Sequence, residues 1–239
     1  MSRSAPAIWA VVPATGVGAR MQAGLPKQYL ELRGRSILAI TLDRLLDHPL
    51  IEGAVVVLAA TDIHWARLGY TASKPLLVCQ GGRERVHSVF NGLQRLATHA
   101  DGDPLVLIHD AVRPCVAHDD LDQLIEAAVT DDGGAILGAP VADTIKLADD
   151  AGRIARTRSR QGLWRAFTPQ AFRLSLIQNA LDTVIERGLP VTDDASAMEV
   201  MGYRPRLVAG DQRNIKITHP GDLALAGLLL DSLGQANSA

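Results

Sequence analysis

Five short, almost continuously apolar runs in the first 140 residues constrain the fold more than any other feature of this sequence. They are residues 8–12, 53–59, 75–79, 104–109 and 134–140. A strand that is apolar at nearly every position is buried on both faces, which is typical of parallel sheets covered by helices on either side. We therefore expect these runs to be the strands of a parallel sheet.

Helical periodicity fills the intervals between the runs. Ser36 is expected to cap a helix whose apolar residues follow at helical spacing, and another helix is expected to begin at Asp119 or Asp120. Strand and helix alternating in this way predict an α/β fold with right-handed crossovers and a doubly wound, mostly parallel sheet. Later in the chain we expect a helix from about Ser175, ended by Gly188.

The pattern changes over residues 141–162, which alternate in polarity and contain a "DDAG" turn at 149–152. This predicts a β-hairpin arm that protrudes from the sheet. Because an isolated two-stranded hairpin is barely stable, we expect the arm to pack against a second subunit of a homodimer. The whole chain, 1–239, is expected to form one domain that includes the arm.

The chain is expected to end with a strand at 214–218 and a helix that begins at Pro220. The apolar stretch in that helix is too short to span a membrane, and the N-terminal apolar run is interrupted too early for a signal peptide. A net charge of −2 and 4% aromatic residues argue against nucleic-acid binding. We therefore expect a cytoplasmic protein that binds neither nucleic acid nor membrane.

The loop after the first run, "PATGVGAR", contains Gly16 and Gly18. A third glycine, as in dinucleotide-binding loops, would fall at Met21, and no G-K-[ST] follows, so neither standard nucleotide motif fits. The glycines let backbone N–H groups approach anionic oxygens, and Arg20 and Lys27 add positive charge. This arrangement favours a triphosphate site; the alternative is a structural turn with two surface cations.

The stretch "LIHDAVRP" places His109 and Asp110 at the carboxyl end of the fourth run, which is the same edge of the sheet. A carboxylate that faces phosphates is a natural partner for Mg²⁺. Alternatively, Asp110 caps the following turn and pairs with Arg113. His109 is more typical of a packed histidine than of a catalyst.

Two further stretches could complete a nucleotide site. Gly81 and Gly82 follow the third run, with Ser88 on the next helix, and paired glycines there allow a flat base to approach the backbone. A plain strand-to-helix turn is the alternative. Lys216 stands in the apolar strand expected at 214–218, where an unpaired charge is costly, so it indicates an anion ligand.

Seven blocks occur in order over about 210 residues: "PATGVGARM…PKQYL", "GGRERVHSV", "HDAVRP", "PVADTIK", "GLWRAFTPQ", "TDDASAME" and "NIKITHPGDL". Together they resemble the 2-C-methyl-D-erythritol 4-phosphate cytidylyltransferases of the non-mevalonate isoprenoid pathway, within the sugar-phosphate nucleotidyltransferases. The resemblance implies a Rossmann-like nucleotidyltransferase fold. It also implies Mg²⁺-assisted transfer of CMP from CTP to 2-C-methyl-D-erythritol 4-phosphate, with release of pyrophosphate.

Carried over by matching positions, the resemblance implies roles for individual residues. Arg20, Lys27 and Lys216 would be catalytic, with Arg20 on the triphosphate and the lysines at the α-phosphate. The nucleotide-binding residues would be Pro13, Ala14, Thr15, Gly16, Gly18, Gly81, Gly82, Ser88 and Asp110, the last also near Mg²⁺. The acceptor would be bound by Thr144, Arg160, Arg113, Asp143 and Thr192, with Arg160 reaching into the neighbouring subunit.

Four positions depart from the family's usual residues: Thr15, Ala19, Val112 and Arg83. Arg83 matters most, because it stands where a carboxylate beside the cytosine turn is common. Two alternative functions remain open from the sequence. One is a cytidylyltransferase for another polyol phosphate, such as ribitol 5-phosphate, and the other is a non-catalytic nucleotide-binding module.

Overall fold

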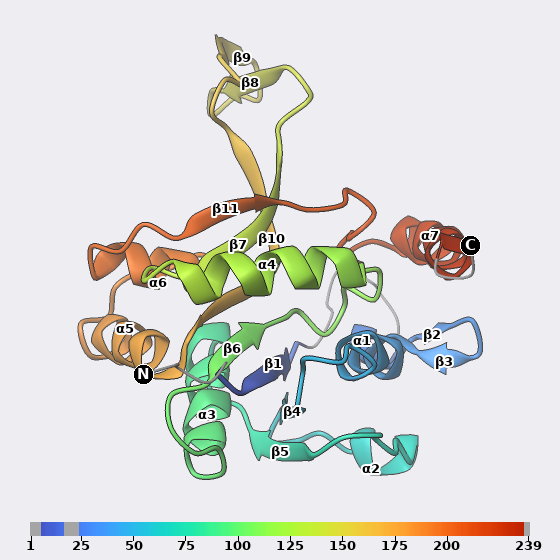
Figure 1. The fold of residues 1–239 in the computed structure, drawn as a ribbon. Coiled ribbons are helices and arrows are strands. Elements are labelled where there is room, and N and C mark those ends of the chain that lie inside the picture. Colours follow the sequence, from blue (N-terminus) through green and yellow to red (C-terminus); the bar gives the residue numbers. More distant parts are fainter. Residues whose placement is uncertain (1–5, 17–23, 237–239) are drawn as a thin grey trace.

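A computed structural model describes residues 6–16 and 24–236, and these form an α/β fold around a seven-stranded sheet (Figure 1). The strand order is β11-β7-β10-β6-β1-β4-β5. The strands are β1 (Ile8–Ala14), β4 (Gly53–Leu58), β5 (Leu76–Gln80), β6 (Leu105–Ile108), β7 (Ala135–Pro140), β10 (Trp164–Arg173) and β11 (Arg206–Ala209). Only β10 runs antiparallel to its neighbours in this described sheet. The predicted mostly parallel sheet is confirmed.

Helices cover both faces of the sheet, which explains the continuous apolar runs. Trp9 and Val11 of β1 pack toward α3 (Arg85–Ala97), α5 (Leu174–Glu186) and α6 (Asp194–Val200). Ala10 and Val12 pack toward α1 (Ile37–Leu46) and α4 (His118–Thr130) on the opposite face. The five predicted runs correspond to β1, β4, β5, β6 and β7, whereas β10 and β11 were not predicted.

The predicted helix ends agree with the structure to within one or two residues. Ser36 caps α1, and its side chain accepts a hydrogen bond from the backbone N–H of Ala39 at 3.1 Å. Helix α4 begins at His118, slightly before the expected acidic start, because the Asp120 carboxylate instead accepts from the backbone of Asp211. Helix α5 ends at Glu186, just before Gly188.

The C-terminal part of the chain differs from the prediction in one respect. Residues 214–218 form neither helix nor strand and join no sheet, so the predicted strand is wrong. Their alternating pattern arises because Ile215 and Ile217 pack into a separate apolar cluster with α1 and α7 (Pro220–Ala236). Helix α7 does begin at Pro220. No helix in the described part of the chain is long and apolar enough to cross a membrane.

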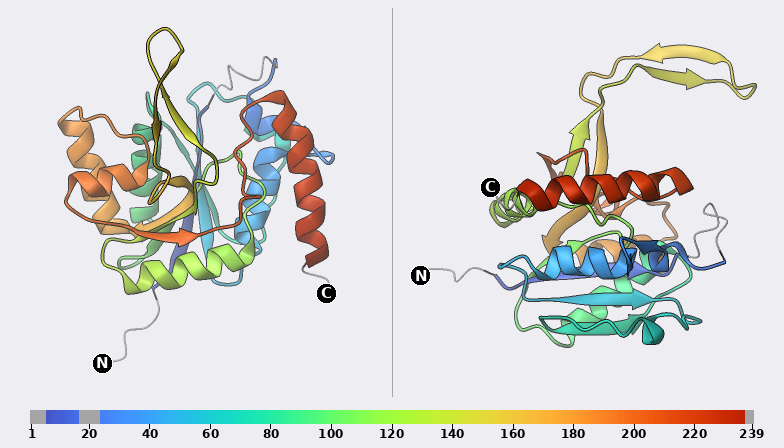
Figure 2. Two further views of the ribbon diagram at one scale, coloured as in Figure 1. Left: turned by 90° about the horizontal axis from the view of Figure 1, so that it is seen from above. Right: turned by 90° about the vertical axis from the view of Figure 1, so that its right-hand side faces the viewer.

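Short elements complete the described structure. The 3-10 turn η2 (Lys27–Tyr29) leads into a small hairpin of β2 (Glu31–Leu32) and β3 (Arg35–Ser36), and α2 (Trp65–Leu68) follows β4. The predicted arm is present as a two-stranded antiparallel sheet of β8 (Ile145–Ala148) and β9 (Ile154–Arg158). Figure 2 shows that it projects from the body beyond β7 and β10. Its part in dimerisation stays a prediction.

Candidate functional site

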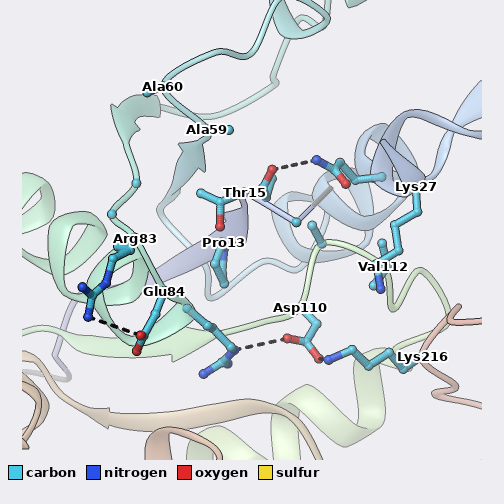
Figure 3. Close-up of a pocket in the computed structure, with 17 residues that line it drawn as sticks. Pro13, Thr15, Lys27, Ala59, Ala60, Arg83, Glu84, Asp110, Val112 and Lys216 are labelled. Carbon is cyan, nitrogen blue, oxygen red and sulfur yellow. Dashed lines mark hydrogen bonds and ion pairs between the residues drawn. The ribbon is translucent and has the colours of Figure 1, made fainter. Parts of the chain in front are cut away.

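A cavity of about 730 Å³ opens at the carboxyl ends of β1, β4, β5 and β6 (Figure 3). This edge of an open α/β sheet is where ligands usually bind. Apart from Lys216, which lies between β11 and α7, the lining residues come from the ends of these strands and the segments that follow them: Pro13, Ala14, Thr15, Gly16, Lys27, Gln28, Ala59, Ala60, Gly81, Gly82, Arg83, Glu84, Arg85, Asp110, Ala111, Val112 and Lys216. The structure therefore brings together residues from four stretches that the sequence had singled out separately.

The glycine loop and η2 are fixed to each other. The side-chain amide of Gln28 donates to the carbonyl of Ala14 at 2.7 Å, and the Tyr29 hydroxyl donates to Asp62 at 2.8 Å. Lys27 directly precedes these two anchored residues in η2 and lines the cavity. Gly18, Ala19 and Arg20 lie outside the described residues.

Two lysines reach the same wall of the cavity. Lys27 Nζ donates to the carbonyl of Ile217 at 3.4 Å, and Lys216 Nζ lies 2.9 Å from Asp110 Oδ2. Figure 3 shows Lys216 pointing at Asp110, with Lys27 and Val112 beside them and Arg83 and Glu84 on the opposite side. Lys216 is thus paired with a carboxylate, although it does not lie in a strand.

Asp110 is the buried carboxylate at the centre of the site. Besides Lys216, Arg113 Nε lies 3.3 Å from Oδ2, and Arg85 Nε lies 3.7 Å from Oδ1. Burial alone would raise the pKa of Asp110, but Arg85, Lys216 and Arg113 together hold that pKa well below its usual range. The carboxylate is therefore ionised at neutral pH. The ion pair with Arg113, expected under the alternative interpretation of this stretch, is present.

His109 is a packed histidine and does not line the cavity. Its side chain is fully buried, and Nε2 donates to the carbonyl of Arg113 at 3.0 Å. Burial lowers the pKa of His109 to about 4, so the ring is neutral at physiological pH.

The Gly81–Gly82 turn is packed too tightly for larger residues. A Cβ on Gly81 would lie 2.3 Å from Thr15 Cγ2 and 2.7 Å from Ser88 Oγ. Ser88 is buried behind the turn, where its hydroxyl accepts from the Gly82 N–H at 3.2 Å and lies 3.3 Å from the Thr15 hydroxyl. Ser88 therefore shapes the turn from behind and does not line the cavity. Arg83, by contrast, is exposed, with Glu84 3.5 Å away.

A second cavity, of about 290 Å³, adjoins the first. It is lined by Arg85, Asp110, Arg113, Ala166, Phe167, Thr168, Gln170, Thr192, Asp193 and Lys216. Arg113 is fixed there by Asp110, by the carbonyl of Asn214 at 2.8 Å and by the ring of Phe167, whose centroid lies 5.6 Å from its guanidinium. The three cationic side chains that line this cavity, Arg85, Arg113 and Lys216, suit an anionic ligand.

The expected acceptor residues divide into two groups. Arg113 and Thr192 line the second cavity. Asp143, Thr144 and Arg160 are exposed on the arm and line neither cavity, and Arg160 donates to the carbonyl of Ala142. A single chain therefore does not bring the two groups together.

Comparison with known proteins accounts for nearly the whole chain. Residues 8–232 match the family model of 2-C-methyl-D-erythritol 4-phosphate cytidylyltransferase. The chain belongs to this family. Enzymes of that name from Stenotrophomonas maltophilia and Pseudomonas aeruginosa are 50% and 48% identical to it, each alignment covering 91% of this chain and 94% of the relative.

Solved structures agree with this assignment. A crystal structure of a 4-diphosphocytidyl-2C-methyl-D-erythritol synthase matches with a TM-score of 0.81 at 35% identity, covering 94% of this chain and 99% of the other. The Francisella tularensis cytidylyltransferase matches with a TM-score of 0.80 at 34% identity, covering 93% and 99%. The expected nucleotidyltransferase fold is confirmed, and the matches support the cytidylyltransferase interpretation over the two alternatives.

Two paired residues at the candidate site, Arg85 and Asp194, were not predicted from the sequence. Arg85 lines both cavities, and both of its terminal nitrogens donate to the buried carboxylate of Asp194, at 2.9 and 2.8 Å. Arg85 lies in the block "GGRERVHSV" and Asp194 in the block "TDDASAME", so the resemblance pointed to both positions. It did not predict that the two residues pair, because they are 109 residues apart in the chain.

Proposed function

We propose that the larger cavity binds CTP and the smaller one binds 2-C-methyl-D-erythritol 4-phosphate, so that CMP is transferred from the first substrate to the second. We also propose that this family member is a cytoplasmic enzyme. The observation that carries the proposal is that the two cavities meet around Lys216 and Asp110. A nucleotide and an anionic acceptor bound in them would have their phosphates side by side.

The reaction is an in-line displacement. A phosphate oxygen of the acceptor attacks the α-phosphorus of CTP, the bond from that phosphorus to the bridging oxygen breaks, and pyrophosphate leaves. A phosphate monoester is already largely ionised at neutral pH, so no general base is needed. His109, which is buried, neutral and outside the cavity, is not required as one.

The protein's part is to bring two anions together and to stabilise the charge of the crowded α-phosphate. Lys27 and Lys216 lie on one wall of the cavity and would supply this stabilisation. Arg20, which lies outside the described residues, would hold the departing pyrophosphate.

The chemistry of the donor set fits a divalent cation, which agrees with nucleotidyltransferase activity. The described residues contain no cluster of three or more metal-ligating side chains. Mg²⁺, however, commonly binds one or two carboxylates together with substrate phosphates, and Asp110 is an ionised carboxylate in the cavity. Asp110 and the phosphates of CTP would hold the ion, which supplies neutralisation of phosphate charge.

The base would be recognised at the Gly81–Gly82 turn, whose backbone can approach a flat ring. Ser88 and Thr15 support this turn from behind, while Pro13, Ala14 and Gly16 frame the other side of the cavity. Gly18 is expected to contact the phosphates from the part of the loop that is not described. Because Arg83 replaces a carboxylate here, selectivity for cytosine would rest on backbone groups.

The acceptor site would be completed by a second subunit. Arg113 and Thr192 line the small cavity within one chain, whereas Asp143, Thr144 and Arg160 lie on the arm. Ile154 and Leu147 on the arm are 68% and 43% exposed, as expected for a surface that packs against another subunit. We propose a homodimer in which each arm reaches the neighbour's small cavity.

Release of pyrophosphate tests the function directly. The chain is incubated with CTP and Mg²⁺, and 2-C-methyl-D-erythritol 4-phosphate or ribitol 5-phosphate is offered in separate reactions. We expect release with the first acceptor only. Release with ribitol 5-phosphate in preference would make that compound the acceptor. No release with either compound would favour a non-catalytic nucleotide-binding module.

A further inference from the structure

Three residues line both cavities: Arg85, Asp110 and Lys216. If CTP and the acceptor occupy the two cavities as proposed above, the new bond forms where the cavities meet, and these residues surround that place. Lys216 and Asp110 already have proposed roles there. Arg85 has none, so the inference concerns this residue and rests on the proposed function.

Arg85 is held in one orientation by a carboxylate that cannot reach the substrates. Its Nη1 and Nη2 donate to the two oxygens of Asp194 at 2.9 and 2.8 Å, which is a bidentate pair. The side chain of Asp194 is 1% exposed, whereas that of Arg85 is 34% exposed. The accessible part of the Arg85 side chain lines both cavities, and its Nε lies 3.7 Å from Asp110 Oδ1, longer than a hydrogen bond.

The anchor of Arg85 is itself rigid. Gln170 on β10 accepts a hydrogen bond from the backbone N–H of Ala195 at 2.8 Å and donates to Asp193 at 2.7 Å. Asp193 also caps α6, in a reciprocal pair with Ser196. The start of α6 is thus tied to the sheet, and Asp194 is tied with it. Such fixed support is what a preorganised charged group requires.

The charges at the junction favour a role in transfer over a purely structural ion pair. Asp194 pairs with Arg85, and Asp110 faces both Lys216 and Arg113 within 3.3 Å, so these two carboxylates are shared among three cations. The transferring α-phosphate is most crowded with negative oxygens when both substrates are bonded to it. A fixed donor at the junction acts mainly in that state.

We infer that Arg85 is a further catalytic residue, which donates to the phosphoryl oxygens where the two cavities meet, and that Asp194 is the positioning residue that holds it there. The nearest test is Arg85→Lys, because lysine keeps the charge and a partner for Asp194 but loses the two-pronged geometry. We expect kcat to fall about 10²-fold, as for lost transition-state donors, with both KM values within about 3-fold of wild type.

Arg95→Lys is the matched control, because Arg95 lies on the same helix, α3, outside both cavities, and contacts Thr98. Its kcat should equal that of wild type. Calorimetry should give a Kd for CTP in Arg85→Lys that also stays within about 3-fold, since the group acts in the transition state. A kcat near wild type, or a loss confined to KM, would overturn the catalytic role.

Asp194→Asn tests the positioning role. It also provides a second test of the inference if the Arg85→Lys variant fails to fold. It should lower kcat in the same direction, and combining it with Arg85→Lys should cost much less than the product of the two single effects. Fully multiplicative effects would overturn the positioning role. An inactive wild-type chain would refute the proposed function and this inference with it, whereas an active wild type with unimpaired variants would refute the inference alone.

Discussion

The carboxyl edge of the sheet and the protruding arm hold their polar residues in opposite ways. At the edge, Asp110 and Arg113 are less than a tenth exposed and are fixed by several ion pairs and hydrogen bonds. On the arm, β8 and β9 are exposed along nearly their whole length. The comparison supports the proposal that one chain supplies the nucleotide half of the site, while the acceptor half also requires the arm of a neighbour.

The largest expected effect tests the edge. Lys27→Ala removes a cation that η2 and Gln28 hold at the cavity wall. We expect kcat to fall about 10²-fold or more, on the order of ~3 kcal/mol, because a fixed donor to the reacting phosphate is lost. Steady-state pyrophosphate release measures it. A near-normal kcat would remove Lys27 from the catalytic group.

The next effect tests the arm. Arg160→Ala should raise KM for the sugar phosphate about 10-fold or more and leave the Kd of CTP unchanged, because Arg160 lines neither cavity of its own chain. Kinetics with each substrate varied, together with calorimetry on CTP, separate the two quantities. Equal loss of both affinities would mean that the arm does not form the acceptor site.

Mixing the two variants sharpens this test. After subunit exchange, about half of the dimers contain one chain of each kind, and in these one of the two sites has both its lysine and its neighbour's arginine intact. With the acceptor well below its KM, where Arg160→Ala alone keeps about a tenth of the activity, we expect the mixture to recover to roughly a quarter of wild-type activity. If exchange is verified by mass and no activity returns, each arm serves its own chain.

A smaller effect concerns the base turn. In Gly81→Ala the new methyl group would displace Thr15 and Ser88, which lie 2.3 and 2.7 Å from its position. We expect the Kd of CTP to rise about 5-fold, the cost of a modest overpacking, while KM for the acceptor is unchanged. Gly221→Ala, where no neighbour lies within 4 Å, is the control. Unaltered CTP binding would show that the turn does not shape the base site.

The last effect is on stability and again separates edge from arm. The pKa of His109 is lowered to about 4 in the fold, so the neutral ring stabilises the protein at pH 7, and that contribution is lost as pH falls below 6.5. We expect the free energy of unfolding to drop by about 2 kcal/mol between pH 7 and pH 5 from this group. His109→Gln should reduce the drop, and a variant with a shortened arm should keep it. Denaturant titrations at both pH values decide.

The sequence predicted those elements whose burial leaves a regular pattern along a single segment of the chain. Runs such as 53–59 are apolar because helices cover both faces, so they predicted the sheet. The pattern failed where tertiary contacts produce it: Ile215 and Ile217 alternate because they pack beside α7, not because they form a strand. Strand β10 was missed because its exposed start and buried end share no single period.

The site divides in the same way. The glycine turns and Asp110 follow strands, so their common edge could be predicted from the order of elements. Ser88 was expected against the base but lies behind the turn, and no local pattern distinguishes these positions. Arg85 and Asp194 were missed because α3 and α6 meet only in the folded chain.

Strand β10 gives the molecule a property of interest for engineering. It runs from the root of the arm at Trp164, through an irregularity in its pairing with β7 between Ala166 and Gln170, to the wall of the small cavity at Thr168 and Gln170. The Thr168 hydroxyl accepts a hydrogen bond from the backbone N–H of Asp110, and the Thr168 carbonyl accepts one from the side-chain amide of Asn214, so the buried half of the strand is fixed at the junction of the two cavities. Under the proposed function, the outer hairpin would contact the acceptor without forming part of the larger cavity. Exchanging it for a hairpin of different length or sequence would then change the acceptor while leaving the proposed nucleotide pocket intact.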